Sequence, residues 1–103
     1  MQLSIQEQER KDTILEAISD RYSRIILEAT MNVPKTALEI STEYNIPIST
    51  AYRRLQVLHD AKLLAISGSI SDDGKKFFMY KSKIKQISTS FQNGIIDVAV
   101  IPN

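Results

Sequence analysis

The spacing of apolar residues is helical over roughly the first 60 positions of the chain and strand-like after them. From Asp12 onward, apolar side chains recur at the period of one helix face, and Ser19-Asp20 interrupts them. We therefore expect one helix over residues 12–19, capped by Asp12, and another over residues 21–31. No apolar residue lies between Ile5 and Ile14, so we expect residues 1–11 to be a polar N-terminal extension, in which Ser4 and Glu7 have capping-box spacing.

The next two predicted helices are joined by a very short connection. Thr36 and Glu39 have the spacing of a capping box at the start of a helix that ends at Asn45. Asparagine tolerates the left-handed conformation that closes many helices, and Pro47 is well placed to begin the following helix. Two helices so close together must turn sharply, so residues 36–61 predict a helix-turn-helix.

The second helix of this pair has two unlike faces. At about 100° per residue, one side collects small aliphatic residues, Ala51, Leu55 and Leu58. The opposite side is polar and basic, with Ser49, Arg53 and Gln56. We expect the aliphatic side to be buried and the polar side to face solvent, where arginine and glutamine can reach base edges in a major groove.

Residues 63–83 show the alternation of a β-hairpin. Asp73-Gly74 is a two-residue turn signal, and with this dipeptide at the turn Ile70 pairs with Phe77 and Gly68 with Met79. One face then carries Leu64, Ile66, Ile70, Phe77 and Met79. Phe78 and Tyr80 are exceptions on the other, polar face.

A second hairpin is predicted over residues 86–101, with Asn93-Gly94 as its turn. This turn pairs Phe91 with Ile96, Thr89 with Val98 and Ile87 with Val100. These six residues share one almost wholly apolar face. The predicted fold is therefore a single α+β domain over residues 1–103, with a helical part followed by two hairpins.

Composition excludes several classes of function. Apolar residues make up 43% of the 103 positions and charged residues 24%, as in ordinary globular domains. The absence of cysteine excludes disulfides, thiolate metal sites and cysteine nucleophiles. His59 is the single histidine, and there is neither a Gly-rich phosphate loop nor a nucleophile elbow, so we expect no catalytic residues, metal or cofactor.

The same sequence predicts a cytoplasmic protein without a membrane partner. No stretch approaches the roughly 20 apolar residues of a membrane span, and the first twelve residues are too polar for the core of a signal peptide. Residues 1–46 carry five basic and eight acidic residues, whereas residues 47–103 carry eight basic and four acidic. This concentration of positive charge favours an anionic partner.

Particular residues extend these inferences through a family resemblance. ILEAISDRYSRIIL, residues 14–27, resembles the opening helices of ArsR-type transcriptional regulators. ALEISTEYNIPISTAYRRLQVLHDAKLL, residues 37–64, is similar to their helix-turn-helix and the start of their wing, and STAYRRLQVL is the strongest match. The final hairpin is similar to that of small archaeal members of this broad group.

The resemblance implies a winged helix-turn-helix homodimer that binds double-stranded DNA and represses or activates transcription. Carried over by position, the recognition-helix face is Ser49, Thr50, Tyr52, Arg53 and Gln56, and the wing contributes Lys75 and Lys76. Arg54 lies between the two helix faces, where we expect its stem to pack and its charge to reach a phosphate. The metal-sensing branch uses cysteine and histidine ligands, so metal sensing by that route is not expected here.

Several assignments keep two interpretations. Tyr52 can contact DNA or cover the edge of the core. For the alternating Lys81, Lys83 and Lys85 we favour protection of an edge strand over DNA contact. The wing tip places Asp72 and Asp73 beside its lysines, which favours an alternative function, a winged-helix protein-interaction module in a larger transcription-related assembly.

The apolar face of the second hairpin also needs a cover, because an isolated two-stranded ribbon is at best marginally stable. It can pack within the chain, against Ile14, Ile18 and Ile26. We favour a dimer interface, to which the N-terminal helix and this hairpin both contribute. Its expected residues are Ile14, Ile18, Phe91, Ile96, Val98 and Val100.

Overall fold

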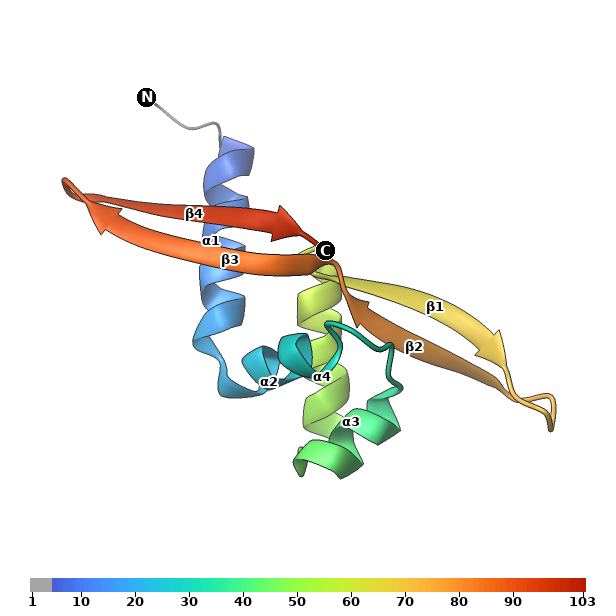
Figure 1. Cartoon of the computed structure of the whole chain (residues 1–103). Helices are drawn as coiled ribbons and strands as arrows, with labels where there is room; N and C mark the ends of the chain where they lie inside the picture. The colour runs from blue at the N-terminus through green and yellow to red at the C-terminus, as the bar shows by residue number, and fades with distance from the viewer. Residues whose placement is uncertain (1–4) are drawn as a thin grey trace.

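Four helices precede two antiparallel β-hairpins in the computed structural model, which describes residues 5–103 (Figure 1). The helices are α1 (Ile5–Ser19), α2 (Arg21–Ala29), α3 (Ala37–Tyr44) and α4 (Ile48–Asp60). The strands are β1 (Leu64–Ile70), β2 (Lys76–Ser82), β3 (Ile84–Gln92) and β4 (Ile95–Pro102). The order confirms the predicted α+β class, a winged helix-turn-helix followed by a C-terminal hairpin.

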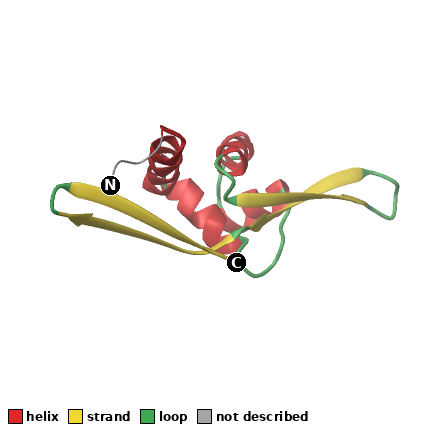
Figure 2. Ribbon diagram, turned by 90° about the horizontal axis from the view of Figure 1, so that it is seen from above, coloured by secondary structure: helices red, strands yellow, loops and turns green. Residues whose placement is uncertain are grey.

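The two hairpins extend in opposite directions from the helical part, β1–β2 to one side and β3–β4 to the other (Figures 1 and 2). The molecule therefore measures 56 × 24 × 21 Å, and its radius of gyration is 15.3 Å. A compact domain of about 100 residues has a radius of gyration of about 13 Å, so this molecule is more extended than a compact one. The outer half of each hairpin extends beyond the helices, although Lys11 of α1 reaches Ile96 in the C-terminal hairpin.

The core lies where α4 meets the other helices and the base of both hairpins. Its largest fully buried apolar side chains are Ile26, Ile40, Ile46, Leu55, Leu58, Leu63 and Leu64. Ile87, Val98 and Val100 pack partly against this cluster, so the base of the C-terminal hairpin is held by the helices of its own chain.

The N-terminal helix is longer than the sequence predicts. Residues 5–19 form one helix, so Asp12 lies inside it and the expected N-cap at Asp12 is wrong. Distant contacts stabilise the polar half that the pattern left out: Arg10 Nη1 donates to the Ala61 carbonyl at 2.7 Å and Lys11 Nζ to the Ile96 carbonyl at 2.9 Å. Ser4, part of the proposed capping box, lies outside the described residues.

The helix-turn-helix forms as predicted. Thr36 accepts a hydrogen bond from the Glu39 backbone N–H, and the Glu39 carboxylate accepts one from the Thr36 N–H. Asn45 closes α3 in the left-handed conformation, with φ 54° and ψ 45°. Ile46 is then buried, and Pro47 is the N-cap of α4, so the connection reverses direction within three residues.

The register of the first hairpin differs from the prediction by one residue. Ile70 pairs with Lys76, not Phe77, and Gly68 pairs with Phe78, not Met79. The Ser71 N–H donates to the Lys75 carbonyl and Gly74 adopts a φ of 84°, so the loop has three residues, with glycine in the left-handed position. The extra loop residue moves Phe78 and Tyr80 onto the face of Ile66 and Ile70.

The register of the second hairpin confirms the prediction. Phe91 pairs with Ile96, Thr89 with Val98 and Ile87 with Val100. Asn93 and Gly94 both have positive φ, 54° and 78°, as a type I′ turn requires. Lys85 sits at an irregularity between Ile84 and Gln86.

Two contacts hold the wing and α2 in place. The backbone of Lys35 exchanges hydrogen bonds of 2.8 and 3.0 Å with Tyr80, which fixes β2 beside the start of α3. The Asp20 carboxylate caps α2 by accepting from the Ser23 N–H at 2.8 Å. α2 ends before its predicted end at Met31, because the buried Thr30 serves as its C-cap.

Asp20→Ala is expected to lower the free energy of unfolding by about 1 kcal/mol, because it removes the cap of α2. Asp12→Ala is the matched control: it removes an exposed aspartate inside α1 and should change stability by less than about 0.5 kcal/mol. Urea unfolding of both variants measures the difference. Equal stability of Asp20→Ala and the parent chain contradicts the capping role.

Candidate nucleic-acid interface

The outer face of α4 is polar and exposed over its whole length. Ser49, Arg53 and Gln56 are all exposed, while Leu55 on the opposite face is 1% exposed and Leu58 is fully buried. The aliphatic face therefore orients the polar one. In the part of the chain that the structure describes, Arg53 has no ion-pair partner, whereas Gln56 Nε2 donates to Asp60 Oδ1 at 2.9 Å along the same face.

The first turn of α4 leaves its backbone donors available. Pro47 is the N-cap and no side chain caps this helix, in contrast with Asp20 on α2 and Thr36 on α3. The Ser49 hydroxyl and the half-buried Thr50 lie in the same turn. Unpaired N–H groups and hydroxyls at a helix start are suited to a phosphate group.

Arg54 is tied to α2 rather than free on the outer face. Its Nε donates to Asp20 Oδ2 at 2.9 Å, and both side chains are about one-third exposed. Burial raises the pKa of Asp20, but hydrogen bonds from Ser23 and the Arg54 guanidinium outweigh it, so this pKa lies below its ordinary value. Asp20 thus joins the cap of α2 to α4 and fixes how α4 is presented.

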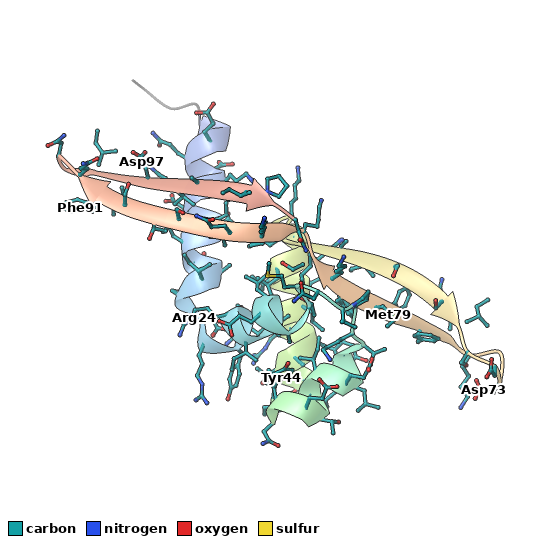
Figure 3. The ribbon with its side chains drawn as sticks, viewed as in Figure 1. Arg24, Tyr44, Asp73, Met79, Phe91 and Asp97 are labelled. Atoms are coloured by element: carbon teal, nitrogen blue, oxygen red, sulfur yellow. The ribbon has the colours of Figure 1, made fainter. Side chains whose placement is uncertain are left out.

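The wing places two lysines beside its loop, but in different surroundings. The Asp73 carboxylate accepts from the Ser71 hydroxyl, a bond that lowers the pKa of Asp73, and it lies 4.0 Å from Lys75 Nζ. Lys76 Nζ lies over the Phe78 ring, 5.3 Å from its centre. Asp73 is labelled at the far end of the wing in Figure 3, where its carboxylate neutralises part of the charge of the lysines.

A groove of about 340 Å³ separates the wing from the start of α3 and α4. It is lined by Thr36, Ala37, Leu38, Tyr52, Lys76, Phe77, Phe78 and Tyr80. Burial, and to a lesser extent Tyr52, raises the pKa of Tyr80. Leu38 is 66% exposed and Tyr52 is 56% exposed. Leu38 and Phe78 are not among the site residues that the sequence predicts. For Phe78 the reason is the one-residue error in the predicted register, which assigned it to the face opposite Ile66 and Ile70.

The residues expected at a dimer interface separate into two groups. Ile14 is buried in the core of its own chain, and Val98 and Val100 pack partly against that core. Ile18 is half-buried beside a groove that follows β3. Phe91 and Ile96 remain 73% and 46% exposed on the outer half of the hairpin. Of the six expected interface side chains, Phe91 and Ile96 are the two that remain exposed in the single chain.

Within residues 5–103 there is no group of histidine, aspartate and glutamate side chains that could hold a metal ion. No helix in that range is long and apolar enough to cross a membrane. No protein-family model matches the chain, and no curated protein matches it.

Arg53→Ala is expected to leave the free energy of unfolding within about 0.5 kcal/mol of the parent, because its side chain is exposed and takes part in no ion pair among the described residues. Leu55→Ala, on the opposite face of the same helix, should cost about 2–5 kcal/mol by opening a cavity in the core. Urea unfolding distinguishes the two. A large loss of stability in Arg53→Ala contradicts the assignment of this face to a partner.

Proposed function

We propose that this chain is a sequence-specific, double-stranded-DNA-binding transcriptional regulator that acts as a homodimer and inserts α4 into the major groove. The observation that carries the proposal is the outer face of α4, on which Ser49, Arg53 and Gln56 are exposed together. None of the three is buried in the core, and the contact that Gln56 makes with Asp60 lies on the same exposed face.

The dimensions and chemistry of this face suit a DNA duplex. An α-helix with its side chains is about 10–12 Å across, and the major groove is about 12 Å wide. The Arg53 guanidinium can donate two hydrogen bonds to guanine, and the Gln56 amide can pair with adenine. Ser49 and the uncapped first turn of α4 supply donors for a phosphate, which sets the register without reading sequence.

The wing supports the same orientation of the duplex. It leaves the C-terminal end of α4, and the Lys35–Tyr80 bridge fixes β2 beside the start of α3. Lys75 and Lys76, beside the wing loop, are the side chains that we expect to contact a flanking phosphate. The likeness of residues 37–64 to ArsR-type regulators supports transcriptional regulation as the role of such binding.

Arg53→Ala is expected to weaken binding to the specific site by about 1–3 kcal/mol and to relax preference at one base position in each half-site. Competition titrations with specific and scrambled duplexes measure both effects. If the variant binds both duplexes as the parent chain does, α4 does not read the sequence.

Lys76→Ala is expected to weaken binding about equally on all duplexes and to reduce the salt slope by about one unit per subunit, because it removes a phosphate contact. Lys83→Ala is the matched control, since Lys83 follows β2 at the base of the wing rather than its tip. Titrations at several salt concentrations give the slopes. Equal slopes for Lys76→Ala and the parent exclude the wing contact.

A second candidate is a winged-helix protein-interaction module, favoured by the groove beside Tyr52 and by the exposed Leu38 and Phe78. A gel shift with a random duplex at low salt separates the two functions. DNA binding that weakens as salt rises supports the regulator. Absence of any shift at low salt supports the module instead.

A further inference from the structure

The outer edge of β3 is an unpaired strand edge. β3 pairs with β4 on one side, and no backbone hydrogen bond from another part of residues 5–103 reaches Ile87, Thr89 or Phe91. The type I′ turn makes Gln92 and Ile95 a hydrogen-bonded pair. Because such pairs alternate, the N–H and C=O groups of Ile87, Thr89 and Phe91 point outward.

The corresponding edge of β4 follows the same alternation but is covered. Ile96, the partner of Phe91, directs its carbonyl away from β3, and Lys11 Nζ of α1 donates to it at 2.9 Å. Lys11 of α1 therefore covers the edge of β4 at Ile96, whereas no hydrogen bond within residues 5–103 reaches the outward groups of β3 at Ile87, Thr89 or Phe91.

The open edge lacks the usual protection against pairing with another strand. Natural edge strands are blocked by lysine, proline, bulges or a covering element. Residues 86–92, QISTSFQ, contain no charge, proline or glycine. Lys85 and its irregular pairing lie just before this run, and the Asn93-Gly94 turn follows it.

We infer that β3 pairs antiparallel with β3 of a second copy of this chain, about a twofold axis at Thr89. Residues 86–92 are centred on Thr89, so this register overlaps the whole uncharged run and pairs every outward N–H and C=O of Ile87, Thr89 and Phe91. Ser88 then lies opposite Ser90 of the second copy, and no charges face one another. The inference deepens the homodimer of the proposed function and rests on it.

A groove beside β3 gives the same register a second support. It has a volume of about 330 Å³, and its apolar lining is Ile18, Leu27, Met31, Ile84 and Ile87. Opposed side chains in antiparallel strands lie on one face with Cβ atoms about 5 Å apart. The axis at Thr89 places Phe91 of the second copy opposite Ile87, at this groove.

The second copy thereby covers Phe91, which is 73% exposed in one chain and lies toward the outer end of the hairpin (Figure 3). The contact is reciprocal, because each chain offers both a phenylalanine and a groove, as a twofold interface requires. Pairing of the two chains also occupies the open β3 edge of each, so no further chain can add and the assembly is a dimer.

Single cysteines test the pairing, since the chain has none of its own. In Thr89→Cys the two cysteines face each other with Cα atoms about 5.5 Å apart, within disulfide range. In the matched controls Ser88→Cys and Ser90→Cys, the two copies of the cysteine are offset along the strands by two residues and lie roughly 8 Å apart, too far for a disulfide. Each variant is oxidised with diamide and its mass is measured without reductant.

The inference predicts a cross-linked dimer for Thr89→Cys and loss of cross-linking in both controls. Cross-linking at Ser88 or Ser90 in place of Thr89, or none in Thr89→Cys, overturns it. Neither result depends on DNA, so a failure here leaves the DNA-binding proposal standing, and failure of DNA binding leaves this interface standing.

A proline tests the edge itself. The Thr89 N–H points away from β4, so Thr89→Pro keeps the hairpin ladder but blocks pairing with a second chain. Sedimentation should give the mass of one chain, 11.7 kDa, for Thr89→Pro and of two for the parent, with unchanged circular dichroism. A parent chain that sediments as a monomer, or a folded Thr89→Pro that remains dimeric, overturns the inference.

Discussion

Burial of the aliphatic face of α4 is the packing constraint on which the rest of the structure depends. Leu55 and Leu58 lie in the centre of the core, where α4 packs against α2, α3 and the start of β1. Within residues 5–103 no other element covers the opposite side of α4, so Ser49, Arg53 and Gln56 are exposed together on it. The neighbouring contacts then set the orientation of that face: Arg54 is bonded to Asp20 on α2, and Lys35 fixes the wing through Tyr80.

The two hairpins extend this small core in different ways. The wing leaves the end of α4 and remains beside the proposed DNA-binding face, so its position matters for contact with a duplex. The C-terminal hairpin packs its base on the helices and extends its outer half, with Phe91, beyond them. A chain of this size leaves an arm uncovered where a second subunit can complete the apolar surface. The proposed dimer would also bring two copies of α4 into one assembly, as a DNA site with two half-sites requires.

Local patterns in the sequence predict those parts of the fold that are governed by local chemistry. The capping box at Thr36, the left-handed Asn45 and the type I′ turn at Asn93-Gly94 each restrict a few residues strongly, and the structure confirms all three.

The predicted register of the wing was wrong because Asp73-Gly74 is compatible with both a two-residue and a three-residue loop. The two loops differ by one position in every residue pair of the hairpin. The polar first half of α1 is stabilised by hydrogen bonds from Arg10 to Ala61 and from Lys11 to Ile96. These partners are far apart in the sequence, so the local spacing of apolar residues could not predict them. The outward face of α4 followed from helical spacing, whereas the Arg54–Asp20 pair and the groove beside Tyr52 required tertiary structure.

Amide chemical-shift mapping of the labelled chain during titration with a DNA duplex shows whether α4 is the element that binds DNA. We expect the largest changes at residues 48–56 of α4, with a second group at Lys75 and Lys76, and we expect all of them to diminish as salt is raised. Changes confined to α1 or to the C-terminal hairpin, with the amides of α4 unmoved, would contradict DNA binding by α4.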